Sequence, residues 1–165
     1  IGGDYLAEGR QDSLELILAH ETAHQWFYAL VGSDQWNQPW QDEALCEYAM
    51  LRYVRARYGQ GSFETLRHYR VDEPLREALP ALTPASPLDY FSTLHDYTAV
   101  VYGRGAALAL ALEEALPGGV DAFLRAYVEK FAFAYVSRAD FEEFLCQYAG
   151  MDLRPLLLDY LDTLM

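Results

Sequence analysis

The run His20-Glu21-Thr22-Ala23-His24 constrains this chain more than any other feature of its sequence. Residues four positions apart on an α-helix lie one turn apart and project from nearly the same face. Two imidazoles placed in this way can bind one Zn²⁺, while the intervening Glu21 points toward a water molecule on the metal. The run therefore predicts a hydrolytic zinc site on a helix, with His20 and His24 as ligands and Glu21 as general base.

A hydrolytic zinc ion needs a third protein ligand and keeps its fourth position for water. The candidate is Glu43, which follows His24 by 19 residues. We expect two antiparallel helices joined by a short loop around residues 32–38, an arrangement that brings Glu43 opposite the histidine pair. Glu47 lies one turn farther along the same face, where its carboxylate could accept a hydrogen bond from a ligating imidazole and fix its tautomer.

Apolar residues recur with the helical period along most of the chain, and no alternating strand pattern or internal repeat is present. We expect zinc-site helices within about 12–58, a helix over about 97–116, and further helices within about 120–164. The sequence therefore predicts a single all-α domain over residues 1–165.

Local signals give the boundaries of the first two helices. The first is expected to begin near Asp12 and to continue through Val31 until Gly32 stops it. The second is expected from about Pro39 to Tyr58, because proline suits a first turn and Gly59 follows. We expect the three tryptophans, Trp26, Trp36 and Trp40, to pack in the core around these helices.

The charge balance narrows the range of partners. Twelve Lys and Arg against 25 Asp and Glu give a formal net charge of -13, which disfavours binding to a phosphate backbone and hence to nucleic acid. The apolar stretches are shorter than the ~20 residues of a membrane span, so no membrane contact is expected. Cys46 and Cys146 are too few for a disulfide scaffold, and both are expected to be buried free thiols.

The spacing of His20, His24 and Glu43 resembles the gluzincin pattern of the aminopeptidase N family. Relatives of that family include leukotriene hydrolases and, more distantly, thermolysin. The neighbouring run His24-Gln25-Trp26-Phe27 and Trp40 add to the resemblance. Where the family commonly has Gly, Asn and Gly, this chain has Tyr28, Asp42 and Ala44. The stretches over residues 31–35 and 39–44 are similar to a bacterial subgroup of the family. The resemblance implies one Zn²⁺ per chain in the helical subdomain of a thermolysin-like metallopeptidase catalytic domain.

A second stretch, residues 101–106, resembles the Y-E-K-G-A motif of the same family. In the family this tyrosine stabilises the tetrahedral intermediate, which implies a catalytic role for Tyr102. A neutral phenol can donate a hydrogen bond to an oxyanion. Arg104 keeps the charge of the family lysine, whereas Gly103 lacks the usual carboxylate. Without this match, Tyr102 would be interpreted as a structural residue that packs at the start of a helix, one of the 13 tyrosines in the chain.

One family landmark is not found in the chain. The family's G-x-M-E-N motif, which grips the free α-amine of a substrate, lies some two dozen residues before the first zinc histidine. Only 19 residues precede His20, and none of them matches it. We therefore expect the amine-binding segment in a missing N-terminal part of a longer protein, and weak or no aminopeptidase activity from this chain alone.

These inferences predict a zinc-dependent aminopeptidase that hydrolyses N-terminal residues of peptides through a zinc-activated water. Another zinc hydrolase, either an endopeptidase or an epoxide hydrolase, is one alternative. The other is a non-enzymatic helical binding module with a vestigial zinc site, which Glu21 argues against because a structural zinc needs no general base. The bacterial cytoplasm and the cell envelope are both compatible with the sequence.

Overall fold

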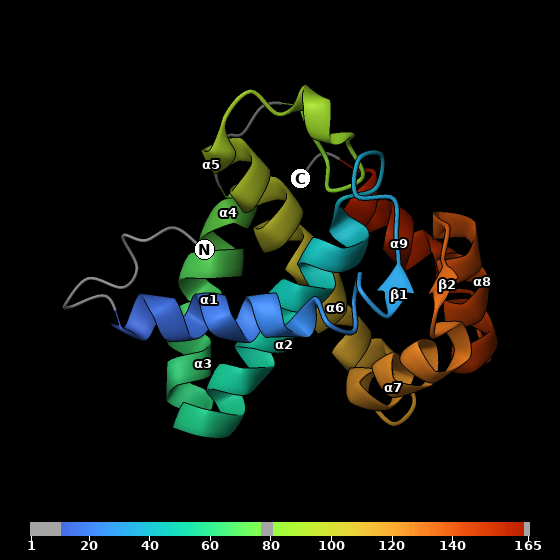
Figure 1. Cartoon of the computed structure of the whole chain (residues 1–165), viewed down its shortest axis with the longest axis horizontal. Coiled ribbons are helices and arrows are strands. Elements are labelled where there is room, and N and C mark those ends of the chain that lie inside the picture. The colour runs from blue at the N-terminus through green and yellow to red at the C-terminus, as the bar shows by residue number, and fades with distance from the viewer. Residues whose placement is uncertain (1–10, 77–80, 164–165) are drawn as a thin grey trace.

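Helices make up most of the computed structural model, which describes residues 11–76 and 81–163 (Figure 1). In chain order the α-helices are α1 (Gln11–Ala23), α2 (Trp40–Tyr58), α3 (Gln60–Arg67), α4 (Glu73–Arg76), α5 (Leu94–Tyr97), α6 (Gly105–Ala115), α7 (Val120–Phe131), α8 (Arg138–Ala149) and α9 (Arg154–Leu161). The prediction of an all-α fold is confirmed. Within the described ranges, no helix is long and apolar enough to cross a membrane.

Three shorter helical segments interrupt this series. They are the π-helix η2 (His68–Asp72), the 3₁₀-helix η3 (Leu88–Tyr90) and the π-helix η4 (Thr98–Arg104). The helix expected over 97–116 is therefore divided, because η4 separates α5 from α6. Tyr102 lies in the π-helical part, where the backbone is wider than in an α-helix.

The first helix ends at Ala23, eight residues before Val31, so its expected extent is wrong. Tyr28 has a φ of 130°, a value outside the α-helical region, and its N–H donates to the carbonyl of Val31. Phe27 and Val31 are nevertheless buried, as the apolar pattern indicated. They reach the core from a turn and a strand rather than from a helix.

Two short parallel strands were not expected. β1 (Val31–Gly32) pairs with β2 (Ala134–Tyr135), which lies just beyond the end of α7. The pairing joins the segment after α1 to the segment before α8, and the amide of Gln41 donates to the carbonyl of Val136 at 3.0 Å. The start of α2 is thereby anchored to a distant part of the chain.

The helix α2 runs through the centre of the fold and packs against α1, α3, α6 and η4. It follows Pro39 and ends at Gly59, whose φ of 87° favours glycine, so its bounds agree with the sequence signals. One face of α2 packs with α6 to α9 in the larger apolar cluster, and another with α3, η2 and α6 in the smaller one.

The tryptophans divide between core and surface. Trp40 is 1% exposed and packs edge-on against Phe141, with ring centroids 5.4 Å apart. Trp26 and Trp36 are 48% and 55% exposed, so their expected burial is wrong. Both lie in the connection between α1 and α2, where the chain turns instead of continuing as a helix. Cys46 is buried as expected, while Cys146 is only half-buried.

Candidate zinc site

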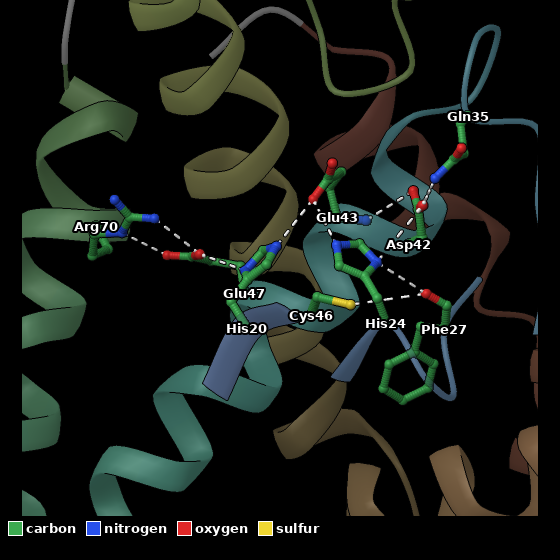
Figure 2. A network of polar contacts seen from close by, with 9 residues as sticks. All are labelled: His20, His24, Phe27, Gln35, Asp42, Glu43, Cys46, Glu47 and Arg70. Carbon is green, nitrogen blue, oxygen red and sulfur yellow. Dashed lines mark hydrogen bonds and ion pairs between the residues drawn. The ribbon is translucent and has the colours of Figure 1, made fainter. Parts of the chain in front are cut away.

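The structure brings the three predicted zinc ligands together (Figure 2). His20 lies in the last turn of α1, His24 follows that helix by one residue, and Glu43 lies in the first turn of α2. Nε2 of His20 donates to Oε2 of Glu43 at 3.1 Å, and Nε2 of His24 lies 3.4 Å from the same oxygen. Tetrahedral zinc with bonds of about 2.0–2.1 Å holds its ligand atoms about 3.3 Å apart. The spacing from Glu43 to each histidine is therefore close to that of a tetrahedral zinc site.

Glu47 makes the contact expected for it and has a partner that the sequence analysis missed. Its carboxylate is 0% exposed and accepts a hydrogen bond from Nδ1 of His20 at 3.2 Å. The guanidinium of Arg70 donates to both oxygens, from Nε at 2.6 Å and from Nη2 at 3.0 Å. This buried carboxylate is therefore held between an imidazole and a guanidinium, and it directs Nε2 of His20 toward Glu43.

A second polar chain orients His24. Its Nδ1 donates to the carbonyl of Phe27 at 3.2 Å and lies 4.0 Å from Oδ2 of Asp42. Asp42 is buried, accepts the amide of Gln35 at 2.7 Å, and also accepts the backbone N–H of Glu43 at 3.0 Å. The turn after α1 thus supplies a carbonyl that points Nε2 of His24 toward Glu43.

Hydrogen bonds between the histidines and the carboxylates shift the pKa values of His20 and Glu43. Burial by itself disfavours the charged ring of His20, but Glu43 and Glu47 outweigh burial and raise the pKa of His20 to about 9. Burial also opposes ionisation of Glu43, yet the two histidines lower the pKa of Glu43 to about 2. Glu43 is therefore an anionic oxygen donor at pH 7, the form in which a carboxylate binds a metal.

Cys46 is a further donor that the sequence analysis did not place at the site. Its sulfur and one ring nitrogen from each of His20 and His24 lie within 4.8 Å of one another. Burial, followed by the charges of nearby carboxylates, raises the pKa of the Cys46 thiol. Zinc binds the deprotonated thiolate, whereas the raised pKa keeps the Cys46 thiol protonated at pH 7. Glu43, which is already anionic, is therefore the better third ligand. The signal for Cys46 was its position three residues after Glu43, on the same side of α2.

Tyr102 and Glu21 lie beside the ligands. The phenol ring of Tyr102 stacks on the His20 imidazole, with ring centroids 5.2 Å apart. Burial, then the charge of Glu43, raises the pKa of Tyr102, so its hydroxyl remains a neutral donor at pH 7. Glu21 is exposed. Both line a cleft of about 370 Å³ with Ser13, Leu16, Ile17, His20, Glu47, Met50 and Arg70.

Two of the curated relatives found by comparison with known proteins have similar identity to this chain. Leukotriene A-4 hydrolase of Xenopus laevis is 29% identical over 146 residues, which are 82% of this chain and 24% of that protein. Probable aminopeptidase 1 of Sulfurisphaera tokodaii is 25% identical over 162 residues, 90% of this chain and 20% of that protein. The chain thus spans about a quarter or less of these relatives.

Solved structures share the fold. Native yeast LTA4 hydrolase aligns with a TM-score of 0.75 at 22% identity, over 98% of this chain and 27% of that one. The M1 zinc metallopeptidase of Deinococcus radiodurans aligns with a TM-score of 0.74 at 23% identity, over 91% of this chain and 34% of that one. The helical arrangement described above is therefore also found in M1 zinc metallopeptidases.

The family comparison covers nearly the whole sequence. The model of the peptidase family M1 domain matches residues 3–160. This range includes the histidine pair, Glu43 and Tyr102. The chain therefore belongs to peptidase family M1.

Proposed function

We propose that this chain is the helical part of the catalytic centre of a zinc aminopeptidase. The observation that carries the proposal is the convergence of two imidazole nitrogens on one carboxylate oxygen of Glu43. His20, His24 and Glu43 would hold Zn²⁺, which when bound acidifies a water molecule and polarises a scissile carbonyl. Membership of peptidase family M1 supports the same chemistry.

The neighbouring side chains would carry the proton and stabilise the developing charge. Glu21 accepts a proton from the attacking water and passes it to the leaving amine. Tyr102 donates a hydrogen bond to the oxyanion that forms on the scissile carbonyl. Its position beside His20 and its neutral hydroxyl support this role.

The proposed substrate is a peptide with a free N-terminus. The curated relatives named as aminopeptidases include one from Sulfurisphaera tokodaii and one from Saccharomyces cerevisiae. Recognition of the α-amine would come from an N-terminal part of a longer protein, because this chain corresponds to only 20% and 15% of those two relatives.

Zinc content tests the ligand set directly. Elemental mass spectrometry of the tag-free chain should give about one zinc per molecule, and His20→Ala should lose it. His68→Ala is the matched control, since His68 lies on the surface and pairs only loosely with Glu73, at 3.5 Å. Zinc retained in His20→Ala, or no zinc in the reconstituted wild type, would overturn the assignment for this chain.

Another zinc hydrolase is the second candidate, because one relative is named leukotriene A-4 hydrolase. Hydrolysis of an aminoacyl anilide and of an N-blocked peptide by the longer protein would separate the candidates. Only an aminopeptidase requires the free amine, so cleavage of the blocked peptide alone would favour an endopeptidase. Zinc binding with no hydrolysis of either substrate or of an epoxide would favour a non-enzymatic binding module.

A further inference from the structure

Two π-helical segments lie near the His20 imidazole and the Glu47 carboxylate bound to it. The segment η2 carries Arg70 and η4 carries Tyr102, and the two segments pack against each other. π-Helical turns are rare and occur frequently at functional sites. The contact between η2 and η4 therefore bears on the orientation of the His20 imidazole.

The contact between the segments is centred on Gly103. A Cβ atom at this position would lie 2.6 Å from the carbonyl oxygen of Arg70, closer than real Cβ contacts come. It would also lie 3.0 Å from Cβ and Cγ of Pro74. The Arg70 oxygen belongs to the backbone and cannot rotate away, so a side chain at residue 103 would push η4 and η2 apart.

Each of the two segments also contacts His20 or its partner. From η2, the Arg70 guanidinium pairs with both oxygens of Glu47, and Glu47 accepts from Nδ1 of His20 at 3.2 Å. From η4, the Tyr102 ring stacks on a face of the same imidazole, with 14° between the ring planes. The separation of η2 from η4 therefore decides whether both contacts form at once.

We infer that Gly103 and Arg70 are positioning residues for His20, a role that rests on the proposed function of His20 as a zinc ligand. Gly103 permits the close approach, and Arg70 transmits it to the imidazole through Glu47. A side chain at residue 103 would separate η2 from η4 and so disturb the path from Arg70 through Glu47 to His20. This gives a physical reason for glycine where the resembling motif has a carboxylate.

The test is zinc affinity, measured by competition with a chromophoric chelator, together with the visible absorption spectrum of the Co²⁺-substituted chain. Gly103→Ala should weaken zinc binding by about 10–100-fold, which is the loss typical of residues that orient a metal ligand. It should also alter the Co²⁺ absorption bands. Gly61→Ala is the matched control, because Gly61 is also helical and a Cβ there meets nothing within 4 Å. It should leave both readouts unchanged.

Variants of Arg70 provide a second, independent test. The Arg70 side chain is partly exposed, so its replacement leaves the hydrophobic core intact. Arg70→Gln should weaken zinc binding to a similar degree, with Arg70→Lys intermediate because lysine keeps the charge but not the two-pronged contact. In the double variant Gly103→Ala/Arg70→Gln the losses should not add, since both act through the same contact.

The possible outcomes separate this inference from the proposed function. A wild-type chain that binds no zinc overturns the proposed function. A wild-type chain that binds zinc, together with Gly103→Ala of unchanged affinity and Co²⁺ spectrum, overturns the inference alone. If Gly103→Ala does not fold, Arg70→Gln decides, and unchanged affinity in that variant rejects the positioning role.

Discussion

The imidazole of His20 stacks on the phenol ring of Tyr102, with ring centroids 5.2 Å apart and planes inclined by 14°. This contact joins the last turn of α1 to η4, two segments separated by about eighty residues in the sequence. It places the Tyr102 hydroxyl beside Glu43, whose charge contributes to the raised pKa of this tyrosine. A proposed oxyanion donor and a proposed zinc ligand are thus packed against each other.

Tyr102→Phe should separate the two contributions of this residue. The ring and its stacking on His20 remain, so zinc content and thermal stability should stay close to wild type. Hydrolysis by the longer protein should fall by about 10²–10³-fold in kcat, the cost of removing one oxyanion donor. Tyr90→Phe, on the exposed Tyr90, is the control. Loss of zinc in Tyr102→Phe with no loss of kcat per bound zinc would contradict this assignment.

Glu21→Gln tests the general base. Glutamine keeps the size of the side chain but cannot accept the proton, so zinc should remain bound while turnover by the longer protein is abolished. Glu64→Gln, on the exposed surface of α3, should leave both properties unchanged. Near-wild-type hydrolysis by Glu21→Gln would show that another group is the base.

Zinc affinity should depend on pH through His20. The pKa of this ring is raised to about 9, so the ring carries a proton at pH 7, whereas an imidazole that binds zinc is neutral. Deprotonation of His20 should therefore raise the apparent affinity by up to about tenfold per unit between about pH 7 and pH 9, and this contribution should level off above that range. Isothermal titration in several buffers would also detect the released proton.

Two checks accompany this pH experiment. Glu47→Gln removes one of the carboxylates that raise the pKa of His20, so its affinity should level off at lower pH. In the metal-stripped chain, the protonated ring stabilises the fold below its ordinary pKa of 6.5, and this contribution is lost as the pH rises through about 9. An affinity independent of pH from 7 to 9 would contradict the protonation of His20.

Ser137→Ala tests a local stabilising feature far from the site. The Ser137 hydroxyl accepts the backbone N–H of Asp140, and the Asp140 carboxylate accepts the backbone N–H of Ser137, which forms a capping box at the start of α8. Removal of the cap should lower the free energy of unfolding by about 1 kcal/mol, measured by urea denaturation.

Ser62→Ala is the comparison variant, for which no decrease in the free energy of unfolding is expected. Ser62 lies inside α3, where alanine is the better helix former, so the free energy of unfolding should stay the same or rise slightly. Neither serine contacts the site, and zinc affinity should be unchanged in both variants. A loss of stability in Ser62→Ala as large as that in Ser137→Ala would reject the capping contribution.

Several elements follow from local sequence signals. Pro39 and Gly59 bound α2, while Ser137 and Gly150 bound α8. Caps, positive φ at glycine and i,i+4 spacing act over only a few residues, so their effects can be predicted without knowledge of packing. The same reasoning placed the histidine pair on one face and marked Glu43 and Glu47 as its partners.

The end of α1 was decided by tertiary structure. The apolar pattern predicted a helix through Val31, and both Phe27 and Val31 are indeed buried. However, the chain turns at Tyr28 and Val31 enters β1, which pairs with β2 about a hundred residues later. A stripe of apolar residues predicts which side chains are buried, but it does not distinguish a helix from a turn followed by a strand.

By itself, the sequence predicted the proposed zinc ligands, the one-turn spacing of His20 and His24 and the all-α fold, because these depend on neighbours along the chain. Only the tertiary structure decided that Arg70 holds Glu47 and that Gly103 meets the Arg70 carbonyl. Arg70 and Glu47 are 23 positions apart in the sequence, and Gly103 is farther still. Contacts of this kind depend on how η2 and η4 pack around α2, and no local signal encodes that packing.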